Sequence, residues 1–98
     1  MILQSSMLKV KPGKASEFES SFRKSQSLLA GTRGYISHEL HKCVEQEDRY
    51  MLLVQWQTLG DHAVGFKHSP ARAEWESFLQ DYYERETETD HYVRIRLE

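Results

Sequence analysis

The sequence has little of several features on which whole classes of protein depend. Its 98 residues contain one cysteine, Cys43, so the chain can form neither an internal disulfide nor a thiolate metal cluster. Thirteen Lys and Arg stand against 15 Asp and Glu, which leaves no basic excess for phosphate contacts and excludes a nucleic-acid partner. Residues 1–10 lack a basic lead-in and are interrupted by polar residues, so we expect no signal peptide, no membrane span and a cytoplasmic location.

Strong hydrophobic residues are also scarce. Leu, Ile, Val and Phe together make up 22 of the 98 residues, close to the roughly 20% below which charged chains tend to stay unfolded. The eleven aromatic residues nevertheless argue that the chain folds, because disordered segments are poor in Trp, Tyr and Phe. We expect one domain over residues 1–98 with a thin core, which self-association would help to stabilise.

Hydrophobic periodicity predicts the element order β-α-β-β-α-β. Alternation predicts strands over residues 2–11, 35–43, 50–56 and 91–97, and a helical stripe predicts a helix from Lys14 to Gly31. Thr58 and Asp61 resemble a capping box that opens a helical stretch to about Lys67, and Ser69-Pro70 starts a second helix. This order is typical of an α+β, ferredoxin-like domain with an antiparallel four-stranded sheet.

The strand over residues 50–56 is apolar on both of its faces. Helices in this topology cover one face of the sheet, so Met51 and Leu53 on the other face need a further partner, and a homodimer is predicted. Matching the apolar faces of the hairpin pairs Leu40 with Leu52, His38 with Val54 and Ile36 with Trp56.

Residues spread over nearly the whole chain resemble the antibiotic biosynthesis monooxygenase family. They are Gly34-Tyr35, the strand from Arg49-Tyr50 through Val54 and Trp56, Asp61-His62, Phe66, Ser69-Pro70, Trp75 and His91-Tyr92. The resemblance implies a dimeric α/β-barrel, in which two ferredoxin-like sheets pack face to face and each subunit keeps a cavity between its sheet and its helices. It also implies oxidation of phenols, quinols or polycyclic aromatics by O2 without flavin, haem or metal, so no cofactor is expected.

The sequence departs from two branches of that family. It contains no asparagine, whereas the haem-degrading branch uses an Asn on its first strand, where Gln4 or Ser6 stands here. This argues against haem degradation. The polyketide-oxidising branch uses an Asn, a Trp, a Tyr and an Arg, of which Trp56 carries over. No G-x-G-x-x-G or P-loop is present, so a nucleotide cofactor is not expected either.

Five histidines offer a proton acceptor, because an unperturbed imidazole titrates near neutral pH. We take His38 and His62 as candidate catalytic bases, with Trp56 as the third catalytic candidate; either histidine could instead be a packing residue. No metal site is predicted, because the spacing of His38 and His41 sends their side chains to opposite faces of a strand.

Further aromatic and polar side chains are candidate substrate contacts around a planar ligand. These are Tyr50, Phe66, Trp75, Phe78, Tyr82 and His91. The alternative is that the aromatic stripe is ordinary core, that the tyrosines lie at a rim and that His91 is an edge residue.

The sequence therefore predicts a homodimeric, cofactor-independent monooxygenase that oxidises a small phenol, quinol or polycyclic aromatic with O2. Two alternatives stay open because a fold does not determine a function. One is a non-oxygenase enzyme, an isomerase or a decarboxylase, on the same scaffold. The other is a dimer that binds a small aromatic without turning it over.

Overall fold

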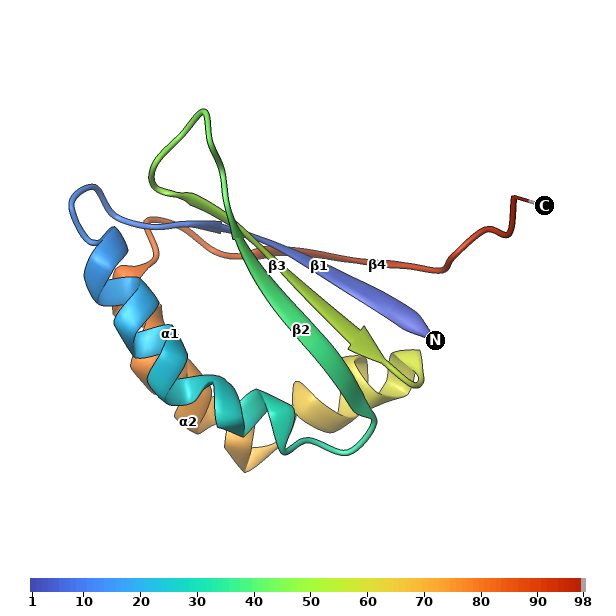
Figure 1. Ribbon diagram of the computed structural model, residues 1–98. Helices are drawn as coiled ribbons and strands as arrows, with labels where there is room; N and C mark the ends of the chain where they lie inside the picture. Colours follow the sequence, from blue (N-terminus) through green and yellow to red (C-terminus); the bar gives the residue numbers. More distant parts are fainter. Residues whose placement is uncertain (98) are drawn as a thin grey trace.

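The computed structural model describes residues 1–97 and has a four-stranded antiparallel sheet with its main helices on one face (Figure 1). The strands are β1 (Ile2–Lys9), β2 (Tyr35–Lys42), β3 (Arg49–Trp56) and β4 (Glu88–Tyr92), in the sheet order β2-β3-β1-β4. The helical segments are α1 (Ala15–Ala30), η1 (Asp61–Phe66), α2 (Pro70–Leu79) and the short η2 (Gln80–Tyr82). The predicted α+β ferredoxin-like fold is confirmed. None of the helices described in these residues is long and apolar enough to cross a membrane.

The core lies between the sheet and the helices. Helix α1 contributes Phe18, Phe22, Ser25 and Leu29, all buried, as its predicted helical stripe requires. Strand β3 contributes every second residue, Tyr50, Leu52, Val54 and Trp56, while Trp75 and Leu79 come from α2. Ser69 accepts a hydrogen bond from the Arg72 amide at the start of α2, as predicted for an N-cap followed by proline.

The hairpin register is confirmed in the middle of the strands and wrong at one end. Leu40 opposes Leu52 and His38 opposes Val54, but Tyr35 takes the place predicted for Ile36 opposite Trp56. The register shifts between Tyr35 and Ser37, so an extra residue is accommodated there. Tyr35 consequently packs against the core, and Ile36 is 43% exposed.

The last strand lies earlier in the chain than predicted. Strand β4 covers Glu88–Tyr92 and pairs with β1, so the strand predicted over residues 91–97 is wrong except at its first two residues. The reason is the length of its neighbour: Tyr92 pairs with Leu3, close to where β1 begins, and the residues beyond it run past the sheet. Figure 1 shows this segment extending away from the fold, with Val93, Ile95 and Leu97 exposed. At its other end, β1 stops at Lys9 rather than at residue 11.

The face of the sheet opposite the helices has no covering element among the described residues (Figure 1). Apolar side chains lie on it in the two central strands, Leu3 and Met7 on β1 and Met51 and Leu53 on β3, and all are partly exposed. Met51 and Leu53 therefore lie on the face away from the helices, as the alternation of this strand predicts.

A capping box fixes the segment that follows β3. The Asp61 carboxylate accepts hydrogen bonds from the Thr58 amide and hydroxyl, each at 3.0 Å, and the Asp61 amide donates to Thr58 Oγ1 at 3.2 Å. The predicted helical stretch is a π-helix, η1, whose wider turn is closed by a hydrogen bond from the Lys67 amide to the His62 carbonyl at 3.0 Å. Gly34 lies directly beside this box with φ of 85°, and a Cβ there would overlap the Asp61 side chain.

Replacing Gly34 should therefore be more damaging than replacing another glycine of similar conformation. Gly34→Ala combines left-handed strain, about 1 kcal/mol or more, with displacement of the Asp61 carboxylate from its box. Gly13→Ala is the matched control, because Gly13 has φ of 78° but open space around the added methyl group. Urea unfolding should show the larger loss for Gly34→Ala, and equal losses would contradict the role of the close contact.

Candidate functional site

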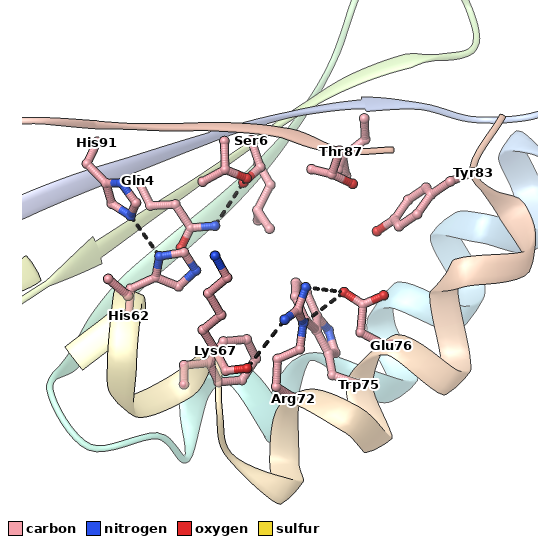
Figure 2. Close-up of a pocket in the computed structure, with 15 residues that line it drawn as sticks. Gln4, Ser6, His62, Lys67, Arg72, Trp75, Glu76, Tyr83, Thr87 and His91 are labelled. Carbon is pink, nitrogen blue, oxygen red and sulfur yellow. Dashed lines mark hydrogen bonds and ion pairs between the residues drawn. The ribbon is translucent and has the colours of Figure 1, made fainter. Parts of the chain in front are cut away.

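A cavity of about 350 Å³ lies between the sheet and the helical layer, on the side of β1 and β4 (Figure 2). Strands β1 and β4 form its upper wall in that view, and η1 and α2 form the lower one. The sheet that opens toward it is unusual because two polar residues of β1, Gln4 and Ser6, are 5% and 2% exposed.

The polar groups of the sheet wall form one hydrogen-bonded chain. Trp56 Nε1 donates to Gln4 Oε1 at 2.9 Å, and Gln4 Nε2 donates to Ser6 Oγ at 2.8 Å. Ser6 Oγ lies 2.8 Å from Thr89 Oγ1, which extends the chain from β3 through β1 to β4. Each buried polar group thereby has a partner, which removes the penalty of burying it.

His62 projects from η1 toward this wall. Its ring stacks on Trp56, with 5.5 Å between centroids and 30° between planes, and its Nδ1 lies 2.7 Å from His91 Nε2 on β4. The other ring nitrogen, Nε2, has no hydrogen-bond partner among residues 1–97. When Nδ1–H donates to His91, Nε2 carries a lone pair and can accept a proton from a ligand.

Burial, followed by the nearby charges of His91, Arg72 and Lys67, lowers the pKa of His62 to about 4. The imidazole is therefore neutral at neutral pH and can accept a proton, although it is a weaker base than an ordinary histidine.

The helical wall carries charged groups. The Arg72 guanidinium bonds Glu76 Oε1 through Nε at 2.9 Å and Nη2 at 2.8 Å. Lys67 follows η1, and Figure 2 shows its ammonium group pointing toward the sheet, on the side of His62. Trp75 also lines the cavity, and its Nε1–H is buried without an acceptor in the described part of the chain.

Tyr83 closes the end of the cavity away from His62, with its hydroxyl turned inward (Figure 2). Burial, reinforced by the Glu76 charge, raises the pKa of this hydroxyl well above its ordinary value. Tyr83 therefore stays protonated and can donate a hydrogen bond to a ligand.

The structure brings four of the predicted site residues to this cavity and places a fifth behind it. His62, Phe66, Trp75 and His91 line the cavity. Trp56 contacts His62 and Gln4 from within the core and is fully buried.

His38 and Tyr50 lie elsewhere, beside a second hollow between α1 and the β2–β3 hairpin. Both ring nitrogens of His38 are engaged, Nδ1 with the Tyr35 hydroxyl and Nε2 with Gln26 Oε1 at 2.9 Å. Tyr50 donates its hydroxyl to Glu19 at 2.6 Å. The structure therefore separates the two histidines that the sequence suggested as alternative bases.

Phe78 and Tyr82 do not line the cavity either. Helix α2 turns Trp75 and Leu79 inward, and Phe78 lies at the edge of that buried face and is 38% exposed. Tyr82 packs near Phe18, and its hydroxyl accepts a hydrogen bond from Ser21 at 3.3 Å.

Several cavity residues were not selected from the sequence. Gln4 and Ser6 had a signal, since they are polar residues on the same face of a predicted strand as Leu8. Arg72, Lys67 and Tyr83 gave no distinguishing pattern in the sequence. Thr87 and Thr89 fell outside the predicted last strand. Within residues 1–97, no three His, Cys, Asp or Glu side chains are placed to hold a metal ion.

Comparison with known proteins gives a family match and a curated relative. The family model described as antibiotic biosynthesis monooxygenase matches residues 1–77. The uncharacterised protein YczJ of Bacillus subtilis (strain 168) is 39% identical over 95 residues, covering 97% of this chain and 100% of YczJ.

Solved structures agree. A protein from Bordetella bronchiseptica, provisionally assigned as an antibiotic biosynthesis monooxygenase, has a TM-score of 0.93 at 26% identity and covers 97% of each chain. SnoaB of Streptomyces nogalater, a cofactor-independent oxygenase, has a TM-score of 0.83 at 17% identity, with 98% of this chain and 94% of SnoaB covered. At that identity the likeness to SnoaB concerns the fold.

The lowered pKa of His62 makes stability depend on pH in a defined direction. An unfolded histidine binds its proton near pH 6.5, whereas folded His62 does so only near pH 4, so the unfolded state binds more protons between these values. The free energy of unfolding should therefore fall as pH drops from about 6.5 to about 4.

His62→Gln should remove this part of the pH dependence in urea unfolding, and His41→Gln, at an exposed site on β2, should retain it. In NMR titrations of the wild type, the His62 imidazole should change its shift near pH 4. A midpoint near 6.5 would contradict the desolvated environment.

Proposed function

The chain belongs to the antibiotic biosynthesis monooxygenase family, and on that premise we propose that it oxidises a small phenol or quinol with O2, without a cofactor, in the cavity beside His62. The observation that carries the proposal is the neutral His62 imidazole, whose Nε2 has no partner in the described chain. It lies in a cavity that offers aromatic surface and hydrogen-bond donors. That combination suits a phenol, which needs a flat apolar contact and a proton acceptor.

The first step is proton transfer. The phenolic O–H gives its proton to His62 Nε2, and the imidazolium that forms keeps its Nδ1–H bond to His91 Nε2. Trp56 holds the ring in place by stacking, and the capping box fixes the start of η1. Positioned acid–base groups of this kind typically contribute about 10²–10⁴-fold to a rate.

The phenolate then transfers one electron to O2, giving a phenoxyl radical and superoxide. Their recombination forms a C–O bond at a ring carbon that carries hydrogen, and the His62 proton is returned to the peroxide. Loss of water leaves a quinone, so that one phenol and one O2 yield one quinone and one H2O. The substrate supplies all four electrons, and the protein supplies deprotonation, positioning and exclusion of water.

The size of the cavity bears on the substrate. Its volume of about 350 Å³ lies at the lower end of the range of about 300–1,000 Å³ for ligand pockets. This supports a substrate of one or two rings over a larger polycyclic aromatic.

Oxygen uptake with a panel of phenols and quinols tests the proposal. His62→Gln should lower the rate by about 10²-fold or more, because the proton acceptor is lost. His38→Gln is the matched control on β2, outside the cavity, and should stay within a few-fold of the wild type in activity. Loss of activity in His38→Gln alone would contradict the assignment of the base.

The same assay separates the alternatives. Turnover that persists without O2 would indicate an isomerase or a decarboxylase. Saturable binding of small aromatics, with no turnover across the panel, would indicate a binding protein.

We also propose that the chain acts as a homodimer through the uncovered face of the sheet. Leu3, Met7, Met51 and Leu53 present partly exposed apolar surface there, and no described element covers it. A second copy of the same face would bury this surface and enlarge a thin core. The exposed side chains of Val93, Ile95 and Leu97, in the segment that extends past the sheet, offer further apolar surface to a partner.

Leu53→Glu should therefore convert the dimer into a monomer in light scattering at micromolar concentration, since it places a charge in the interface. Val44→Glu is the control, because Val44 lies in a loop and is 91% exposed. A wild-type protein that is monomeric, or a Leu53→Glu variant that stays dimeric, would contradict this arrangement.

A further inference from the structure

The cavity beside His62 carries a positive charge that its own side chains do not balance. Lys67 and Arg72 line it, with Glu76 as the one carboxylate of the lining. Glu76 Oε1 is engaged by two nitrogens of Arg72, within 2.9 Å. The Lys67 side chain is exposed at the mouth of the cavity, and its ammonium has no partner in the part of the chain that the structure describes. The chain as a whole has a net charge of −2, so this excess is local.

The uncharged hydrogen-bond donors around the cavity also favour a ligand that carries oxygen acceptors. The Tyr83 hydroxyl stays protonated, and the Trp75 Nε1–H is buried in the cavity wall without an acceptor among the described residues. An unpaired buried N–H is costly, and an acceptor on a ligand would relieve that cost. A ligand with several oxygen acceptors and one negative charge would complement both the donors and Lys67.

Resting on the proposed function, we propose that the substrate is an aromatic hydroxy acid, whose carboxylate pairs with Lys67 while its ring hydroxyl meets His62 Nε2. A simple phenol is neutral when it enters, because its hydroxyl titrates near pH 10, and it leaves Lys67 unpaired. A carboxylate is already ionised at neutral pH and can pair with Lys67 on binding.

The carboxylate would also act on the base. Burial is the largest cause of the lowered pKa of His62, and the charges of His91, Arg72 and Lys67 lower it further, so that the imidazole is a weaker proton acceptor. A bound carboxylate offsets the contribution of Lys67 and Arg72 and so raises the pKa of His62 in part. Binding of the acid thus prepares the imidazole to take the phenolic proton, which a neutral phenol would not do.

The test compares 4-hydroxybenzoate with its neutral analogue 4-hydroxybenzamide by calorimetry, with NMR observation of the His62 imidazole. The acid should bind about tenfold or more tightly than the amide, because it gains a charge-assisted hydrogen bond. Lys67→Met, which keeps the side-chain stem, should abolish this preference. Lys24→Met, at an exposed position on α1, should preserve it. The acid should also raise the His62 titration midpoint, and the amide should not.

Equal affinity for acid and amide, or a preference that survives Lys67→Met, would overturn this inference. Inorganic phosphate that binds as tightly as the acid would overturn it too, because the aromatic ring would then contribute nothing. These outcomes are distinct from failure of the proposed function. Acid-selective binding without O2 uptake would contradict the proposed oxygenase activity and support the carboxylate site at Lys67. Rapid oxidation of neutral phenols without a preference for the acid would support the activity and contradict the site.

Discussion

The hydrogen-bonded chain that runs from Trp56 through Gln4 and Ser6 to Thr89 is the constraint on which the rest of the site depends. Two polar side chains of β1 are buried where the sheet would otherwise be apolar, and each must find a partner inside the fold. The row of hydrogen bonds gives both side chains a partner and links three strands, β3, β1 and β4. These groups bond to one another and not to the helices, and the cavity lies between them and α2.

That constraint also determines the chemistry available to His62. Trp56 is held by Gln4, and the indole in turn stacks on the His62 ring, so the position of the imidazole follows from the polar chain. Burial and the cations of the helical wall keep the imidazole neutral. Lys67 then gives the cavity a charge that an anionic ligand would balance. Binding and proton transfer would be coupled, because the ligand carboxylate that pairs with Lys67 would also raise the pKa of His62.

Regular hydrophobic periodicity made most of the fold predictable from the sequence. The features that could not be predicted are local irregularities in strand pairing. The stripe of α1, the two-faced β3 and the Ser69-Pro70 start of α2 each follow from spacing and capping chemistry. The extra residue near Ile36 and the position of β4 along the chain depend on how each strand pairs with its neighbour. The spacing of apolar residues within one strand does not predict that pairing. Among the aromatic candidates, Phe66 and Trp75 line the cavity, whereas Tyr50, Phe78 and Tyr82 do not. Its charged side, Lys67 and Arg72 with Glu76, depends on how η1 and α2 are turned toward the sheet.

The most direct test of the central claim is a crystal structure of the protein with a small aromatic hydroxy acid bound. Density for the ring should lie between the hydrogen-bonded residues of the sheet and α2, with the hydroxyl within hydrogen-bond distance of His62 Nε2. Density beside His38, in the hollow between α1 and the hairpin, would contradict it, as would a ligand bound on the uncovered face of the sheet.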